Sequence, residues 1–125
     1  IAVDVTYTSD YPGVDIAATG DVRVGGGPVL VNNPSCHRKL QRLLRQAAEK
    51  QGIAVQTEAA TGRTGTDGDV IHKTGEGVPF SLVSIPLRYM HSPAEVGSLA
   101  DIQGCIDLLA QFLADLDPSL DLTWY

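Results

Sequence analysis

Short apolar runs rich in β-branched residues alternate along this chain with segments of helical periodicity. Each run has the length and composition of a strand, and the predicted strands are 1–8, 28–32, 53–57 and 78–85. The predicted helices are 33–51, 70–74 and 98–116. Because strands that alternate with helices pack in layers, this order predicts an α/β fold, namely a layered α/β/α domain with a mostly parallel sheet. A long irregular segment joins the first two strands, which could pair in either direction.

Length and composition set the class of protein. The 125 residues suffice for one compact domain, and a content of 43% hydrophobic and 19% charged residues is typical of a chain that buries a core. A net charge of −6 argues against a nucleic-acid binder. No apolar run approaches the roughly 20 residues of a membrane span, and the first residues do not have the basic-plus-apolar pattern of a signal segment. Because Cys36 and Cys105 are too few for a disulfide framework, we expect a cytoplasmic protein.

Both long helices carry recognisable end signals and apolar faces. Asn33 is expected to cap the first, with Pro34 in its first turn and Gly52 closing it, and its basic residues read as a solvated outer face. The apolar stripe expected to pack inward from the second helix is Leu99, Ile102, Cys105, Ile106, Leu109 and Leu113. The tail after it is expected to be ragged unless Trp124 docks on the domain.

The segment 84–95 follows an apolar strand and concentrates reactive side chains. Arg88, Tyr89 and His91 fall within four residues of each other. Ser92 and Glu95 have capping-box spacing, so His91 is expected on a short, stiff loop at the carboxyl end of a strand. In open α/β sheets ligands bind at that edge. The alternative is a surface histidine beside a turn.

Other polar positions are less specific. Asp4 lies inside an apolar strand, where it either faces water or meets a cation, an arginine or a metal. The glycines of 25–27 suggest a phosphate loop, but no Lys-Ser/Thr pair or helix follows directly, so a turn is favoured. The loop 58–69 is rich in hydroxyls and carboxylates, as site-lining loops often are. His37 is expected on the solvated outer face of its helix, and His72 is expected to be a packing or surface residue.

Four motifs occur together in chain order: residues 2–6 (Ala-Val-Asp-Val-Thr), Gly27-Pro28, Gly65-Thr66-Asp67, and residues 85–93 (Ile-Pro-Leu-Arg-Tyr-Met-His-Ser-Pro). This combination resembles the C-terminal part of the glutamyl/deblocking aminopeptidases of the tetrahedral (TET) type, an endoglucanase-like metallopeptidase family, over nearly the whole chain. The resemblance implies that residues 1–125 are the C-terminal portion of a zinc-aminopeptidase-like catalytic domain. A chain that opens on Ile1 directly in a strand agrees with a piece of a longer protein.

The resemblance also implies a site with two divalent metal ions, zinc or cobalt, and it matches Asp4 and His91 to one ligand of each. A carboxylate and a neutral imidazole are ordinary ligands of these metals. Thr66 and Asp67 are expected either to approach the peptide substrate or to cap a helix. Gly68 departs from the family, which usually has Ala there. Arg88 and Tyr89 would hold the loop or meet substrate, with a structural salt bridge and a packed ring as the alternatives.

The family's other functional residues have no match in this chain. They are an N-terminal His, a bridging Asp and a Glu-Glu pair that includes the general base, and the inserted dimerisation domain is missing as well. We therefore expect no catalytic residue here and an inactive isolated chain, while the parent protein is expected to be a homo-oligomeric, metal-dependent aminopeptidase. The alternatives are a non-catalytic α/β interaction module and, more weakly, a phosphate- or nucleotide-binding domain.

Overall fold

The computed structural model describes residues 1–123, without the side chains of residues 18 and 19, so the expectation for Trp124 falls outside the described residues. Its elements in chain order are β1 (Ala2–Tyr7), α1 (Ile16–Thr19), β2 (Val29–Asn32), α2 (Arg38–Gln51), β3 (Gln56–Ala59), α3 (Gly68–Ile71), β4 (Leu82–Leu87) and α4 (Leu99–Ala114). Within this part of the chain, no helix is long and apolar enough to cross a bilayer.

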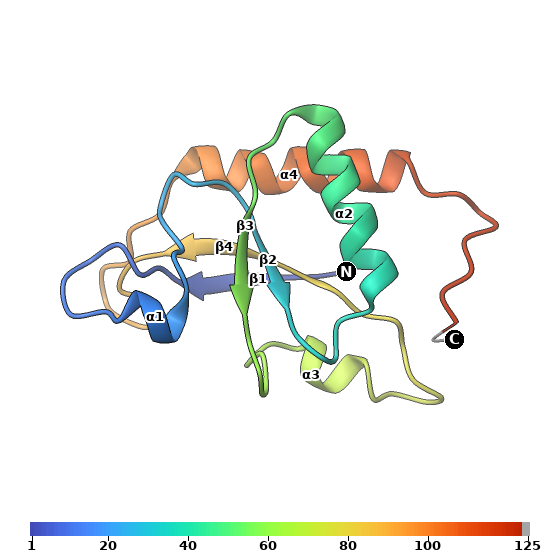
Figure 1. The fold of residues 1–125 in the computed structure, drawn as a ribbon, viewed down its shortest axis with the longest axis horizontal. Helices are drawn as coiled ribbons and strands as arrows, with labels where there is room; N and C mark the ends of the chain where they lie inside the picture. Colours follow the sequence, from blue (N-terminus) through green and yellow to red (C-terminus); the bar gives the residue numbers. More distant parts are fainter. Residues whose placement is uncertain (124–125) are drawn as a thin grey trace.

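The four strands form one sheet in the order β1-β4-β2-β3, so that β4, the last of them in the sequence, lies between β1 and β2. The pairs β1–β4 and β2–β3 are parallel, whereas β2 and β4 meet antiparallel over a short register in which Val29 faces Ser84 and Leu30 faces Val83. The β1–β4 ribbon therefore crosses the β2–β3 ribbon in Figure 1. The predicted mostly parallel sheet is confirmed, and the first two strands do not pair with each other.

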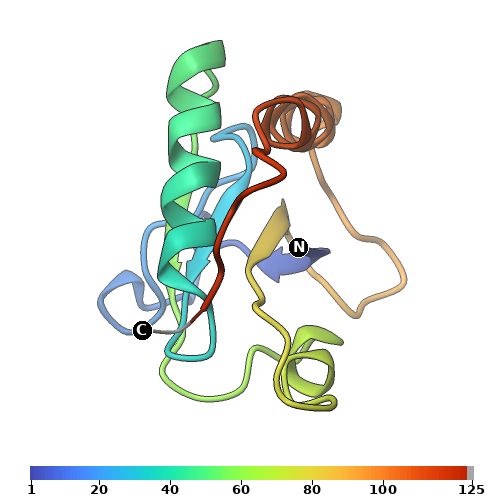
Figure 2. The same cartoon turned by 90° about the vertical axis from the view of Figure 1, so that its right-hand side faces the viewer.

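Helices lie on both faces of the sheet, which confirms the layered α/β/α prediction (Figure 2). Helices α2 and α4 pack together and bury the core of one face, whose members include Leu30, Leu44, Val83, Cys105, Leu108 and Phe112. A smaller core of Val31, Cys36, Phe80 and Leu82 lies on the other face, on the side of α3. Both cysteines are buried free thiols, as expected of core residues.

The predicted inward stripe of α4 is wrong in most of its members. The residues that α4 buries are Asp101, Cys105, Leu108 and Phe112. Leu99, Ile106 and Leu113 instead face outward, with 84%, 54% and 64% of their surface exposed. The helix is apolar on two sides, so its periodicity could not decide which side meets the sheet.

The predicted start of the first long helix is wrong, and the pair with capping-box spacing does not cap a helix, because other hydrogen bonds engage these side chains. Asn33 accepts from the N–H of Ser35 and donates to the carbonyls of Ala60 and Gly62, so it ties two loops and α2 begins at Arg38. The Glu95 carboxylate accepts from the N–H of His91, and Ser92 starts no helix.

The remaining element boundaries differ modestly from the prediction. Gly52 closes α2 with a left-handed φ of 65°, as predicted. Ser98, where the second long helix was predicted to begin, caps α4 through the N–H of Ala100. Strands β3 and β4 begin three or more residues later than expected, at Gln56 and Leu82. Helix α1 lies within the segment expected to be irregular.

The glycine run 25–27 makes the predicted turn and binds a carboxylate of the protein itself. Asp101, which is almost fully buried on α4, accepts from the N–H of Gly25 at 2.7 Å and from that of Gly27 at 2.8 Å. A Cβ on Gly27 would lie 2.0 Å from the carbonyl oxygen of Ala54, so only glycine fits there. Since Asp101 occupies these donors, the phosphate-loop hypothesis is not supported.

An ion pair joins the segment after β1 to the end of β4. Arg88 donates from Nε to one carboxylate oxygen of Asp10 at 2.9 Å and from its terminal nitrogen to the other at 2.6 Å. The Asp10 side chain is only 12% exposed and that of Arg88 36%. The Arg88 guanidinium holds the pKa of the Asp10 carboxyl well below its usual range. Arg88 thus has the structural role considered above, and the ring of Tyr89 packs against Tyr11 with centroids 5.4 Å apart.

Replacing Asp101 tests the glycine turn. We expect Asp101→Ala to lower the free energy of unfolding by about 2–4 kcal/mol, because two backbone N–H groups lose a charged acceptor in a buried setting. Urea denaturation followed by circular dichroism measures the change. Asp107→Ala, an exposed carboxylate on the same helix, is the matched control and should change little. Equal effects of the two substitutions would contradict this account.

Replacing Asp10 tests the ion pair and its pH dependence. Asp10→Asn should cost about 1 kcal/mol at pH 7, a value reduced because Arg88 is partly exposed to water. The folded pKa of Asp10 lies below its unfolded value of about 3.9, so the contribution is complete above that value and is lost as the pH falls through the folded pKa. Urea unfolding at pH 7 and pH 3 should therefore show a smaller gap between wild type and variant at pH 3. Asp21→Asn, in the exposed pair with Arg23, is the control.

Candidate functional site

The carboxyl ends of β1 and β4 meet at one edge of the sheet, because the two strands are parallel neighbours. Tyr7 and Leu87 are the last residues in register. The chain then makes a loop over residues 88–96, which Arg88 and Val96 close by exchanging two N–H···O bonds of 2.9 and 3.1 Å. His91 is carried on this closed loop, as the sequence predicted for the end of this strand.

The loop 88–96 is fixed at several points. Arg88 anchors its base to Asp10, the N–H of Ser92 donates to the carbonyl of Tyr89 at 3.0 Å, and the N–H of His91 donates to the Glu95 carboxylate at 2.7 Å. Tyr89 and His91 have left-handed φ values of 59° and 67°. Each such residue costs roughly 1–2 kcal/mol, so the surrounding hydrogen bonds hold a conformation that the free chain would disfavour.

The imidazole of His91 contacts Tyr7. The Tyr7 hydroxyl and Nδ1 of His91 are 3.0 Å apart, and the two rings meet edge to face at 87° with centroids 5.9 Å apart. Among the described residues, Nε2 of His91 makes no hydrogen bond. Tyr7 lies in the predicted strand 1–8, and strand periodicity does not reveal what lies beyond the strand end.

Asp4 lies on β1 in register with Ser84 of β4. Side chains alternate along a strand, so Asp4 and Thr6 share one face of β1 and Tyr7 belongs to the other. The Asp4 carboxylate accepts from the N–H of Val5 at 2.8 Å and is half-buried. Beyond that bond, no hydrogen bond or ion pair joins Asp4 to another described residue.

A second carboxylate lies on the face of Asp4 and was missed from the sequence. Thr6 is buried, and its hydroxyl donates to Glu58 of β3 at 2.6 Å. The hydroxyl of Ser84, on the same face, is buried without a partner among the described residues. Glu58 was assigned to a loop because the strand was predicted to end at residue 57, whereas β3 continues to Ala59.

The donors present fit a metal in kind but not in number. Asp4 offers a carboxylate oxygen and His91 offers Nε2, both ordinary ligands of zinc or cobalt. No hydrogen bond joins the two side chains, and the described residues contain no group of three or more His, Cys, Asp or Glu side chains that could hold a metal ion. An open catalytic metal normally takes about three protein ligands and water. The role of Asp4 and His91 as ligands therefore stays a prediction.

The loop that carries Thr66 and Asp67 folds around another carboxylate. Asp69 accepts from the N–H groups of Thr64 and Gly65, both at about 3 Å. The hydroxyls of Thr66 and Thr64 bond to each other, whereas Asp67 occupies the N-cap of α3 with an exposed side chain that makes no cap bond. No hydrogen bond within residues 1–123 connects Thr66 or Asp67 to Asp4 or His91. Their contact with substrate stays a prediction.

Two neighbours of this loop have packing roles. A Cβ at Gly68 would lie 2.0 Å from the ring of Phe80, which explains why Gly and not Ala follows Asp67 here. His72 stacks on the same ring, as expected of a packing residue.

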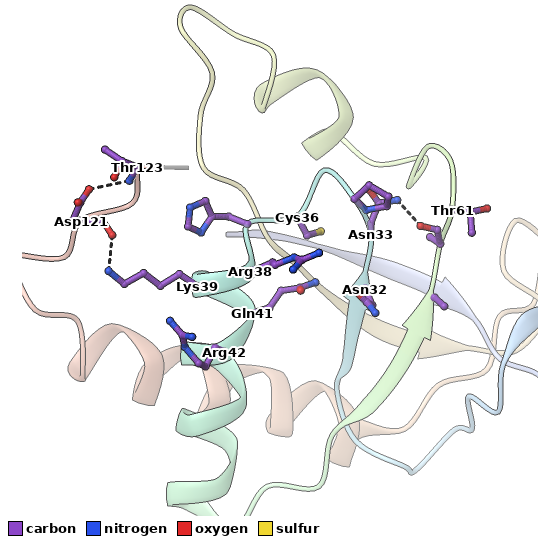
Figure 3. A pocket seen from close by; sticks show the side chains of 14 residues that line it. Asn32, Asn33, Cys36, Arg38, Lys39, Gln41, Arg42, Thr61, Asp121 and Thr123 are labelled. Carbon is purple, nitrogen blue, oxygen red and sulfur yellow. Dashed lines mark hydrogen bonds between the residues drawn. The ribbon is translucent and has the colours of Figure 1, made fainter. Parts of the chain in front are cut away.

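A hollow of about 870 Å³ lies elsewhere, at the carboxyl ends of β2 and β3 and the start of α2 (Figure 3). Arg38, Lys39 and Arg42 line it, and Lys39 reaches across to the carbonyl of Asp121 at 2.6 Å. Arg38 and Arg42 are exposed, which confirms the predicted solvated outer face of α2. His37 also lines the hollow and is buried, contrary to the surface expectation. The hollow includes no predicted site residue.

Comparisons with known proteins agree with the resemblance noted in the sequence. The sequence pattern of the M42 glutamyl aminopeptidase family matches residues 1–108. The lysyl aminopeptidase of Pyrococcus furiosus is 37% identical over 100 residues, which cover 80% of this chain and 29% of the relative. The chain spans about a third of the length of the curated relatives it matches.

Solved structures are similar in the same way. A TET aminopeptidase from a marine-sediment Thaumarchaeota archaeon superposes with a TM-score of 0.84 at 28% identity, covering 93% of this chain and 33% of that one. The TET1 peptidase of Pyrococcus horikoshii, which can assemble into a tetrahedron or a large octahedral shell, gives a TM-score of 0.65 at 29% identity, with 91% and 33% covered. With the family pattern matched over most of its length, this chain belongs to the M42 glutamyl aminopeptidase family.

Proposed function

We propose that this chain is the C-terminal third of a metal-dependent aminopeptidase that removes N-terminal residues from peptides. The loop 88–96 is the observation that carries the proposal. It holds His91 at the end of β4 with its backbone and Nδ1 both engaged and Nε2 free of hydrogen bonds to described residues. The neighbouring strand β1 carries Asp4. The family resemblance supports Asp4 and His91 as metal ligands of the complete protein.

In the proposed enzyme, Nε2 of His91 and the carboxylate of Asp4 would each supply one ligand to a pair of divalent ions, zinc or cobalt. Such a pair, when bound, polarises the scissile carbonyl and lowers the pKa of a bound water. The residues of this chain hold and orient: loop 88–96 fixes His91, and the loop of Thr66 and Asp67 would approach the substrate. The general base and the remaining ligands would come from residues outside this chain, so the isolated chain should be inactive.

The outward apolar side of the domain supports a larger catalytic domain. Leu99, Ile106 and Leu113 of α4 are exposed, and so are Ile1 and Val3 of the β1 segment. Beside them lies a mainly apolar hollow of about 430 Å³. Within the described sheet, β1 pairs only with β4, so its second edge has free backbone groups. Exposed apolar side chains beside an unpaired strand edge are typical of an interface, and we assign this side to the remainder of the catalytic domain.

The assembly and location of the whole protein are also proposals. The TET1 peptidase of Pyrococcus horikoshii assembles into shells, which supports a homo-oligomer for the complete protein. We place it in the cytoplasm, as composition suggested. The second candidate is a non-catalytic α/β interaction module, favoured by the small number of metal donors in the described residues. In that case the apolar surface would bind a partner protein.

Activity separates the two candidates. The complete product of the reading frame that encodes this chain should hydrolyse aminoacyl p-nitroanilides when loaded with zinc or cobalt and lose that activity in a chelator. His91→Ala and Asp4→Ala should each lower kcat/KM by about 100-fold or more, since a lost ligand costs at least as much as the 10–100-fold typical of residues that support one. The isolated chain should show no hydrolysis.

Asp107→Ala, at an exposed position of α4, is the control for these substitutions and should keep full activity. A complete protein that folds and is supplied with metal but cleaves none of the peptide substrates would reject the enzyme assignment and favour the interaction module. Full activity in both ligand variants would reject the assigned residues.

Polar substitutions on the outward side of α4 test the larger domain. In the isolated chain, the double variant Ile106→Lys, Leu113→Lys should change the free energy of unfolding little, because both side chains face water. It should also reduce self-association and the binding of a dye that reports exposed apolar surface. In the complete protein the same pair should be strongly destabilising. Leu108→Ala, at a fully buried position, is the contrast and should cost about 2–5 kcal/mol in either form. Urea denaturation and light scattering measure both effects, and tolerance of the lysines in the complete protein would contradict the proposed interface.

A further inference from the structure

We propose that Tyr7 is a positioning residue for His91, holding the imidazole through Nδ1 so that Nε2 is presented as the ligand atom. The inference deepens the proposed function and rests on it for the identity of the ligand. Its geometry stands independently. Tyr7 ends β1 in register with Leu87, so its phenol lies beside the loop that leaves β4 and reaches Nδ1 at 3.0 Å.

Among the described residues, Tyr7 is the only side chain that hydrogen-bonds to the His91 imidazole. Glu95 is the closest alternative acceptor in sequence, but it binds the backbone N–H of His91. Asp10, the buried carboxylate at the base of the loop, has both oxygens engaged by Arg88. The loop hydrogen bonds fix the backbone of His91, and the hydroxyl contact with the perpendicular ring packing fixes the side-chain rotation.

A phenol has a property that the usual partners of ligand histidines lack. Carboxylates and backbone carbonyls only accept, so they hold an imidazole whose Nδ1 carries the proton. A hydroxyl both donates and accepts. Tyr7 therefore donates its hydroxyl hydrogen to Nδ1 when the imidazole proton is on Nε2. It accepts from the N–H of Nδ1 when Nε2 binds a ligand and the proton is on Nδ1. The ring keeps one position in both states, and only the hydroxyl hydrogen turns.

The first test uses nuclear magnetic resonance on the 125-residue chain, with ¹⁵N-labelled histidine at a pH where the imidazole is neutral. In wild type, nuclear Overhauser effects should connect the rings of Tyr7 and His91, and their absence would overturn the proposal without any variant. In Tyr7→Phe, the Nδ1 and Nε2 signals of His91 should move towards those of a solvated imidazole, while those of His37 and His72 stay in place. Unchanged His91 signals would overturn the proposal.

The second test measures zinc affinity of the complete protein by competition with a chelator. Tyr7→Phe should bind zinc about 10–100-fold more weakly, the range for residues that orient a ligand. Tyr11→Phe is the matched control, because Tyr11 packs on Tyr89 and makes no contact with His91. Equal affinities of Tyr7→Phe and wild type would overturn the positioning role. A wild type that binds zinc but cleaves no peptide would reject the proposed function alone, since the affinity comparison does not depend on turnover.

Discussion

Parallel pairing between β1 and β4 is the constraint on which the candidate site depends. It sets Ala2 beside Leu82 and Tyr7 beside Leu87, so the first strand of the chain runs alongside the last. Three relations of the site cross this seam: Tyr7 reaches His91, Asp10 binds Arg88, and Asp4 stands opposite Ser84. A slip of one residue would turn Asp4 to the other face of the sheet and remove Tyr7 from His91.

The elements themselves were largely predictable, whereas their use of particular side chains was not. Alternating strand and helix patterns gave the correct class and the correct order of long elements. They could not reveal that α4 would bury Asp101, because a charged residue on a helix ordinarily faces water and its acceptor role needs Gly25 and Gly27 from a distant turn. Asn33 and Glu95 carried good cap signals, but Asn33 binds a distant loop and Glu95 binds the N–H of His91 within its own loop.

Part of the candidate site could be predicted from the sequence, for a different reason. Asp4 and His91 stood out as polar residues in or directly after apolar strands, and the family motifs gave them a shared role. Tyr7 and Glu58 had no such contrast with their surroundings. Tyr7 fits a strand face on composition alone, and the importance of Glu58 depends on the crossing of the two ribbons that brings it to Thr6. Sequence patterns report local environment, and these two residues act across the sheet.

The buried carboxylate of Asp101 has a consequence for how the domain folds during synthesis. Its partners Gly25 and Gly27 leave the ribosome long before α4 does, so the glycine turn must wait with open amides until the last helix is made. β1 waits in the same way for β4. A chain whose decisive contacts join its two ends has high contact order, which slows folding and leaves an apolar edge unpaired for the longest time. For this domain, we therefore expect vulnerability to aggregation to last until α4 has left the ribosome and packed.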